Sequence, residues 1–200
     1  MLTIQYTVDN KRYDVELQES QRVFNNYRKA VIRAARSNLK KEGKIASGRL
    51  FKNIRLSITA SEHIVTIQPF MKGADYWQYV DQGVQGAKSN VLAPDSPFKF
   101  GSGTGPKGKL VPAIDRWTIV KPIKEVRDER GRFIPRKRLV RMIARSVYLK
   151  GLRPTYFISD PFEKLIDRYL DRLGEAFAED VNRDLMIPLV GEPITLRLSI

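Results

Sequence analysis

The sequence predicts an α+β fold in which helices pack on a small antiparallel sheet, with extended loops and one long C-terminal helix. Two stretches, near residues 2–17 and 54–67, alternate apolar and polar residues as the strands of hairpins do. Two others, 19–42 and 160–186, repeat apolar residues every three or four positions, the period of an amphipathic helix. Hydrophobic residues make up 42% of the 200-residue chain, which is enough for the core of a folded domain.

The first 18 residues are expected to form an N-terminal hairpin arm. Apolar residues alternate on both sides of a polar turn at 9–12. They are Leu2, Ile4, Tyr6 and Val8 before the turn, and Tyr13, Val15 and Leu17 after it. Residues 19–186 form the predicted main domain. The last segment, 187–200, is a predicted tail whose weak alternation of Ile194, Leu196, Leu198 and Ile200 fits a further strand.

A long helix is expected from residue 19 to residue 42, with Gly43 as its stop signal. Its apolar face consists of Val23, Tyr27, Ala30, Val31, Ala34 and Leu39. The opposite face is basic and carries Arg22, Arg28, Lys29, Arg33, Arg36, Lys40 and Lys41. Such a two-sided helix would cover a core with its apolar face.

A second hairpin and a short aromatic helix are expected next. Strands alternate at 54–58 and from Val65 onward, across a turn at 60–63. The short helix contains Tyr76, Trp77, Tyr79 and Val80. Asp75 is a plausible N-cap and Gly83 a plausible C-cap for it. Its aromatic rings could stack on bases, but helical spacing beside Val80 favours a place in the core.

Residues 84–109 are expected to form a long loop rich in glycine, serine, proline and lysine, around the apolar island 97–100. A short helix follows, marked by Leu110, Ile114 and Trp117 and ended by Lys121 and Pro122. The segment 121–138 is a basic insertion. Another helix is marked by Leu139, Ile143 and Val147 and closed by Gly151.

The final helix has the strongest predicted start. Asp160 is expected to be its N-cap, Pro161 its first residue, and Glu163 the partner in a capping box. Its apolar face consists of Phe162, Ile166, Tyr169, Leu173, Phe177 and Val181. Arg168 and Arg172 lie among its acidic residues at spacings that favour surface ion pairs.

The composition excludes several kinds of chemistry. The chain has no cysteine and one histidine, His63, which is placed in a turn without catalytic partners. The loop 103–110 resembles a P-loop, but Leu110 stands where a Mg²⁺-binding Ser or Thr is needed. We therefore expect no enzyme activity, no cofactor and no metal. No apolar run is long enough for a membrane span and no secretory signal is seen, which predicts synthesis in a cytoplasm.

Charge is the most unusual property of the chain, and it is unevenly spread. Lys and Arg number 36 against 22 Asp and Glu, a net charge of +14. Residues 1–158 carry +18, of which +9 falls in 121–153, whereas 160–186 carry −4. The candidate basic surface comprises Arg132, Arg136, Lys137, Arg138, Arg141 and Arg145. It would face DNA phosphates, or the acidic helix of another copy, or only solvent.

The order of these features resembles the tail-completion and head–tail joining proteins of tailed bacteriophages. A basic helix leads to 46–50, a hairpin follows, and the segments 76–84 and 151–157 precede the last helix. The positions that match the motifs of that family are Tyr76, Tyr79, Val80, Gly83, Pro154 and Phe157. The N-terminal hairpin, the loop 84–109 and the insertion 121–138 exceed the minimal pattern of the family.

The resemblance implies a non-enzymatic virion protein, made in the cytoplasm of the host bacterium. Such proteins form rings, commonly six- or twelve-fold, in the head–tail connector (neck) or at the top of the tail, with the genome passing through the central channel. The implied partners are further copies of the chain, neighbouring connector, portal or tail proteins, and genomic double-stranded DNA; no membrane is implied. The alternative is a free basic nucleic-acid-binding protein with a regulatory or packaging role.

Overall fold

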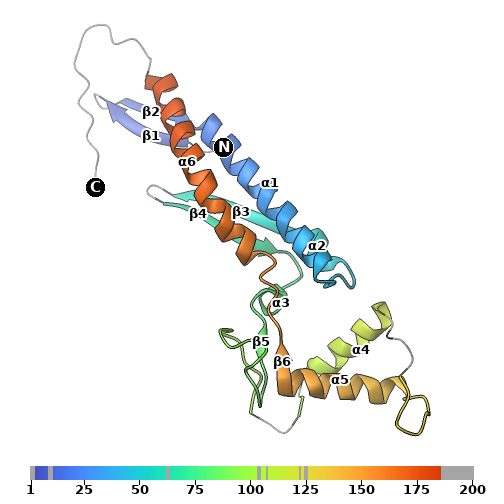
Figure 1. Cartoon of the computed structure of the whole chain (residues 1–200). Helices are drawn as coiled ribbons and strands as arrows, with labels where there is room; N and C mark the ends of the chain where they lie inside the picture. Colours follow the sequence, from blue (N-terminus) through green and yellow to red (C-terminus); the bar gives the residue numbers. More distant parts are fainter. Residues whose placement is uncertain are drawn as a thin grey trace. The chain divides into compact units, whose positions relative to one another are not determined.

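The computed structural model describes residues 3–8, 11–61, 64–102, 105–106, 108–121, 123 and 126–185 (Figure 1). His63 and the tail 187–200 lie outside them. The described elements, in order, are β1 (Thr3–Val8), β2 (Lys11–Glu16), α1 (Gln18–Lys41), α2 (Arg49–Asn53), β3 (Ile54–Ser61), β4 (Ile64–Met71), α3 (Trp77–Asp81), β5 (Val84–Gln85), α4 (Leu110–Val120), α5 (Arg136–Lys150), β6 (Gly151–Leu152) and α6 (Ser159–Leu185). The predicted α+β class and the long last helix are confirmed.

The chain forms two compact units, each built from segments far apart in the sequence. Unit 1 consists of the described residues of Met1–Ala34, Arg55–Phe70 and Asp160–Ile200, and unit 2 of those of Ala35–Ile54 and Met71–Ser159. By sequence, unit 1 has 12 basic and 14 acidic residues, a net charge of −2, and unit 2 has 24 and 8, a net charge of +16. The predicted division into 1–18, 19–186 and 187–200 stays a prediction, because the two compact units do not show which segments fold independently.

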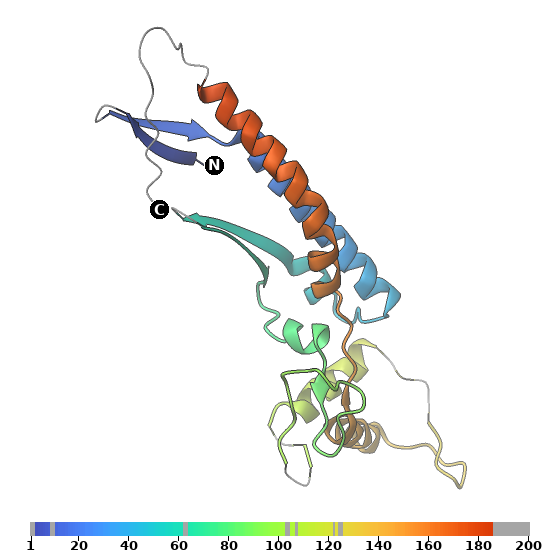
Figure 2. The ribbon, with the colours of Figure 1, turned by 60° about the vertical axis from the view of Figure 1, so that its left-hand side comes forward.

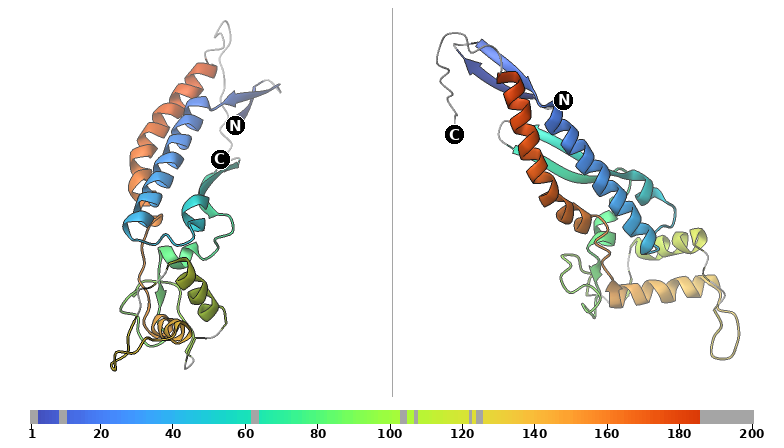
Figure 3. Two further views of the ribbon diagram at one scale, coloured as in Figure 1. Left: turned by 90° about the vertical axis from the view of Figure 1, so that its right-hand side faces the viewer. Right: turned by 45° about the horizontal axis from the view of Figure 1, so that its top comes forward.

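In unit 1, α1 and α6 lie side by side, and the two hairpins lie on the same side of this helix pair (Figures 2 and 3). Strand β1 pairs antiparallel with β2, with Thr3 opposite Glu16 and Val8 opposite Lys11. Strand β3 pairs with β4, and the Ser57 hydroxyl donates to the Gln68 carbonyl across the hairpin at 3.3 Å. Within the described residues, each hairpin is a separate two-stranded sheet, so neither sheet extends the other.

The contact between α1 and α6 is centred on Tyr27. This side chain is 1% exposed, and its ring makes edge contacts with Phe162 and Tyr169 at centroid distances of 5.8 and 5.4 Å. Its hydroxyl donates to the Phe162 carbonyl at 2.8 Å. Burial raises the pKa of Tyr27 to about 12, so the hydroxyl remains a donor at neutral pH. The apolar face predicted for this helix is confirmed at Tyr27, Val31 and Leu39, which are all buried.

The start of α1 is held by a carboxylate from the far end of the chain. Asp180 of α6 is fully buried and accepts hydrogen bonds from the backbone N–H groups of Glu19 at 2.9 Å and Ser20 at 2.8 Å. Arg183 lies 3.3 Å from the same carboxylate. The first N–H groups of a helix have no partner within it, and the helix dipole favours a negative charge there. Asp180 therefore caps α1 and ties it to the last turns of α6.

Asp180 should make the stability of unit 1 depend on pH. Burial alone would raise the pKa of Asp180, but the N–H groups of Ser20 and Glu19 and the charge of Arg183 outweigh burial and lower it below 3.8. The stabilisation is therefore present at neutral pH and is lost as the pH falls below about 3.8 toward the lower pKa of the folded state. We expect Asp180→Asn to lower the free energy of unfolding by about 1–2 kcal/mol at pH 7.

Denaturant unfolding followed by circular dichroism at pH 7, 5 and 3 would measure this effect. The difference between the wild type and Asp180→Asn should shrink toward pH 3, because acid neutralises the wild-type carboxylate. A difference that stayed constant over this range would show that the charge of Asp180 does not stabilise the helix end.

In unit 2, α4 packs on α5. The buried residues of α5 are Val140, Ala144 and Tyr148. Leu139, Ile143 and Val147, which mark this helix in the sequence, are half-buried. The buried face lies one residue further along because Tyr148 turns inward: its hydroxyl donates to the Gly101 carbonyl at 2.6 Å, and its ring lies against Phe100. A long-range contact thus sets the rotation of the helix.

The described part of the predicted loop 84–109 is largely irregular but is anchored at Gln85. The backbone N–H of Gln85 donates to the Phe98 carbonyl at 2.8 Å, and the Phe100 N–H donates to the Gln85 carbonyl at 2.9 Å. The Gln85 side-chain amide donates to the carbonyls of Pro94 and Ser96 at 3.0 and 2.9 Å. These bonds fold the apolar island 97–100 back onto the short strand β5.

Candidate functional site

The two segments that carry the family resemblance, 76–84 and 151–157, lie against each other in unit 2. Strands β5 and β6 pair antiparallel, with Val84 opposite Leu152. The backbone N–H of Thr155 donates to the carbonyls of Val80 and Asp81 at 3.2 and 3.0 Å, and the Tyr156 N–H donates to the Asp81 carbonyl at 2.9 Å. We call this contact between the two segments the motif junction.

Asp81 holds the motif junction and the start of α6 together. It is fully buried, and one carboxylate oxygen accepts from the Ile158 N–H at 3.0 Å and the Ser159 N–H at 3.4 Å. The other oxygen accepts from the Ser159 hydroxyl. Asp81 is thus the residue that caps the N-terminus of α6. Its place in the sequence, at the end of a short aromatic helix, gave no sign of this role.

Two predicted helix caps are therefore wrong. The helix α6 begins at Ser159, before Asp160, and Asp160 pairs with Lys164 at 2.6 Å instead. The local capping-box pattern is overridden because the Asp81 carboxylate already binds the N–H groups at this end. At α3, Asp75 is not the N-cap: the helix begins at Trp77, and the N-cap position is held by Tyr76 without a side-chain hydrogen bond.

Close backbone contacts explain the glycines of the motif junction. Gly83 has φ +73°, and a Cβ there would lie 2.6 Å from the Leu152 carbonyl oxygen and 2.7 Å from the Pro154 nitrogen. Gly151 has φ +91°, and its Cβ would meet the Val84 carbonyl oxygen. Only glycine combines this backbone conformation with such close approach.

The other motif residues separate into buried and exposed positions. Phe157 is fully buried, and Val80 and Pro154 are half-buried. Tyr76 and Tyr79 are 44% and 45% exposed, so the expectation that the aromatic set lies in the core is wrong for both. They are exposed because α3 is a short five-residue helix with Asp81 as its buried residue.

Tyr76 and Tyr79 each interact with another residue of unit 2. The Tyr79 ring packs edge-on against Phe98 at 4.6 Å. Partial burial raises the pKa of the Tyr76 hydroxyl, and the positive charge of Arg49 opposes this.

The six residues of the candidate basic surface fall into two groups, those that are paired with an acidic residue in the described part of the chain and those that are not. Arg132 belongs to a compact hairpin loop in which Asp128 accepts from the Arg130 and Arg132 N–H groups at 3.0 and 2.8 Å. The Arg132 guanidinium also pairs with Asp128 at 2.9 Å. The Arg132 N–H is the main reason why the pKa of Asp128 lies below its usual range. The guanidinium of Arg127 lies 3.8 Å above the Phe133 ring and completes the loop.

Arg136, the first residue of α5, binds the neighbouring helix α4. Its guanidinium pairs with the Asp115 side chain of α4 at 2.7 Å and donates to the Asp115 backbone carbonyl at 2.9 Å. Arg136 and Arg132 are thus engaged within unit 2, and neither is available in this structure as an unpaired cation.

The other four candidates form one exposed stripe on α5. They are Lys137, Arg138, Arg141 and Arg145, and we call them the basic stripe. Within the described part of the chain none of the four forms an ion pair, although the charge of Arg138 contributes to the low pKa of Asp128. Helix α5 carries no acidic residue to neutralise the stripe. This stripe is the part of the predicted surface that remains open to a partner.

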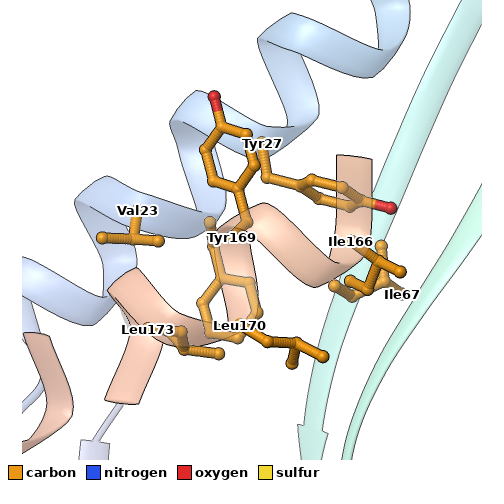
Figure 4. A pocket seen from close by; sticks show the side chains of 8 residues that line it. Val23, Tyr27, Ile67, Ile166, Tyr169, Leu170 and Leu173 are labelled. Carbon is orange, nitrogen blue, oxygen red and sulfur yellow. The ribbon is translucent and has the colours of Figure 1, made fainter. Parts of the chain in front are cut away.

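Unit 1 has an open apolar hollow of about 250 Å³ between α1, β4 and α6. Figure 4 shows its lining side chains, which come from Val23, Phe24, Tyr27, Ile67, Ile166, Tyr169, Leu170 and Leu173. Ile166, Tyr169 and Leu173 of the apolar face predicted for the last helix lie here. Phe177 of that face is 44% exposed, and Leu170, which was not part of it, is 52% exposed. In the described residues the buried positions of this helix beyond its first turn are Ala176 and Asp180.

The ion pairs predicted on α6 for Arg168 and Arg172 are absent among the described residues. The two ion pairs of this helix there are Lys164–Asp160 and Arg183–Asp180. The Arg172 guanidinium lies 5.8 Å from the Tyr169 ring instead. The acidic side chains of α6 are therefore less neutralised than their sequence spacing suggests.

Comparison with known proteins adds no family to this picture: no protein-family model, no curated protein and no solved structure matches the chain. In the described parts of the chain, no group of three or more acidic or histidine side chains is placed to hold a metal ion. None of the helices described there has the length and hydropathy needed to cross a membrane.

Proposed function

We propose that this chain is a structural virion protein of a tailed bacteriophage. In this proposal it forms a homo-oligomeric ring, six- or twelve-fold, in the head–tail connector or at the top of the tail, around the DNA channel. It is made in the cytoplasm of the host bacterium, acts without enzymatic chemistry and meets neighbouring connector, portal or tail proteins. The sequence resemblance suggests the class, and one structural observation supports assembly.

That observation is the separation of charge between the two units. Unit 2 carries +16 and unit 1 carries −2, and the basic stripe on α5 has no ion-pair partner among the described residues. When the two parts of a chain differ in charge in this way, attraction between the basic part of one copy and an acidic surface of another favours assembly. Contacts between two different surfaces close into rings when the rotation between copies permits it.

The test is the mass of the purified chain in solution together with its presence in phage particles. Mass photometry and electron microscopy should show closed rings at low salt, and antibody labelling should place the chain at the neck of virions. A chain that stays monomeric under every condition and is absent from particles would rule the proposal out.

The alternative is a free nucleic-acid-binding protein, and the basic stripe is the observation that favours it. Four unpaired cations on one helix would neutralise about four phosphates, which predicts a slope of about −3.6 in log K against log salt. Gel-shift titrations of the isolated chain across salt concentrations measure that slope. Tight DNA binding by a monomer that is missing from particles would favour the alternative. Weak DNA binding by a ring found in particles would favour the virion protein.

A further inference from the structure

We propose that the apolar hollow of unit 1 is the docking site for helix α5 of a second copy of this chain. In this contact the basic stripe of one copy lies along an acidic stripe of the other, formed by Glu163, Asp167 and Asp171 of α6. The inference rests on the proposed ring and names the surfaces that would form it.

The hollow is an unfilled apolar surface within unit 1. Its lining comes from two helices and a strand, and Leu170 at its edge is 52% exposed. Phe177, two turns further along α6, is 44% exposed. Exposed apolar side chains gathered beside an open hollow are typical of a protein-binding surface, because covering them removes apolar area from water.

The acidic stripe lies directly beside this hollow on α6. Glu163, Asp167 and Asp171 follow each other at intervals of four residues, so they form one row along the helix. All three are exposed, and none of them forms an ion pair in the described part of the chain. Like charges at this spacing repel one another within a helix. A row of cations from outside would relieve that repulsion.

The basic stripe of α5 has the same spacing. Lys137, Arg141 and Arg145 also follow at intervals of four residues, so each row advances by about 6 Å per charge. Two helices packed side by side can therefore bring the rows into register over three pairs of charges. This match of sign and period favours α5 as the occupant of the site.

Apolar contacts would accompany the charge pairs. Met142 is 49% exposed and lies three residues before Arg145, beside the basic stripe. Leu170 lies three residues after Asp167, beside the acidic stripe. A methionine side chain adapts well to an irregular apolar hollow. Each face thus offers an apolar side chain next to its charges, as an interface core does next to its polar rim.

The contact is heterologous, because it joins two different surfaces. Each copy then places its α5 on one neighbour and receives the α5 of its other neighbour in its hollow, which is the arrangement that a ring requires. Exposed charge pairs are screened by salt, so assembly should weaken as the ionic strength rises.

Complementary charge reversal tests the inference. The first variant carries Glu163→Lys, Asp167→Lys and Asp171→Lys, and the second carries Lys137→Glu, Arg141→Glu and Arg145→Glu. Each alone should remain monomeric, because its two faces then carry the same sign. An equimolar mixture should assemble again, with an apparent affinity at least tenfold above that of either variant alone, measured by mass photometry.

A matched control lies on the same helix. Lys164→Glu and Arg168→Glu also reverse charges at a four-residue interval, but on the side of α6 away from the hollow, and they leave Arg172, which lies beside Tyr169, unchanged. This variant should assemble as the wild type does. If it loses assembly as the first variant does, or if the mixture of complementary variants stays monomeric while each is folded by circular dichroism, the assignment of these faces is wrong.

Cross-linking keeps the inference testable if a triple variant does not fold. Because the sequence contains no cysteine, Met142→Cys and Leu170→Cys can be made in separate chains and mixed under mild oxidation. A disulfide-linked dimer should form between them, whereas Lys150→Cys, exposed about two turns further along α5, should yield little dimer with Leu170→Cys. Equal yields from both pairs would overturn the docking site.

The outcomes also separate this inference from the proposed function. Rings that persist in both charge variants would leave the virion role intact and place the interface elsewhere. A wild-type chain that never assembles would contradict both the docking site and the proposed ring. Loss of DNA binding in the second variant, with unchanged assembly, would assign the basic stripe to nucleic acid and overturn the docking of α5.

Discussion

Replacing Asp81 by alanine should lower the free energy of unfolding by about 3 kcal/mol, which is a large fraction of the stability of a small protein. The carboxylate accepts the N–H groups of Ile158 and Ser159 and the Ser159 hydroxyl, and it is fully buried. Alanine would leave buried donors at the start of α6 without a partner, and such donors are costly. Denaturant titration followed by circular dichroism would measure the loss.

Asp75 provides the matched control for this prediction. It lies six residues before Asp81 and is exposed, and it does not cap α3. Asp75→Ala should change the free energy of unfolding by less than about 0.5 kcal/mol. Similar losses in Asp75→Ala and Asp81→Ala would mean that general charge effects, and not the cap, explain the result. Asp81→Asn should fall between the two, since the amide keeps one acceptor oxygen but lacks the charge.

Replacing Gly151 by alanine should cost about 3–5 kcal/mol, for two additive reasons. The backbone at Gly151 has φ +91° and ψ −171°, a conformation that is nearly restricted to glycine. The new Cβ would also lie 2.7 Å from the Gly86 nitrogen and against the Val84 carbonyl oxygen. Backbone atoms of a paired strand cannot move aside as a flexible side chain can. The pairing of β5 with β6 should therefore be lost.

Gly174 offers a control in the same chain, for which the opposite change in the free energy of unfolding is expected. It lies inside α6, and among the described residues no atom apart from the adjacent helix backbone lies within 4 Å of the position that a Cβ would take. Gly174→Ala should raise the free energy of unfolding by about 0.5–1 kcal/mol, because glycine weakens a helix interior. Thermal unfolding of the two alanine variants in parallel would show shifts in opposite directions. A Gly151→Ala chain with wild-type stability would contradict the close strand contact.

Local patterns carried much of the secondary structure. The apolar period predicted a helix at 19–42, and α1 spans Gln18–Lys41. The helix marked by Leu110, Ile114 and Trp117 is α4, and it ends at Val120, before Lys121. These predictions succeeded because helix formation depends on residues within one or two turns of each other. The markers Leu139, Ile143 and Val147 did not show which face of α5 is buried, because this depends on Tyr148 reaching Gly101, 47 residues away.

The residue types of the candidate surfaces could be predicted from the sequence, but the pairing of their charges and the exposure of their apolar side chains could not. The excess of basic residues in 121–153 is plain from the sequence, yet Arg132 and Arg136 turn out to be paired with Asp128 and Asp115. The apolar stripe of the last helix is equally plain, and the sequence could not show that Leu170 and Phe177 would stay exposed. Whether a charge is paired or an apolar face is covered depends on neighbours that local spacing does not specify.

The α+β class, the two long helices, the lack of cysteine and the excess of positive charge could all be predicted from the amino-acid sequence, because each is a property of local pattern or composition. Which carboxylate caps which helix depends on the tertiary structure. Asp180 caps α1 across a separation of 161 residues from Glu19, and Asp81 caps α6 across 77 residues from Ile158. A cap over such a distance leaves no periodic signal in the sequence, since it arises only when folding brings a buried carboxylate to a helix end.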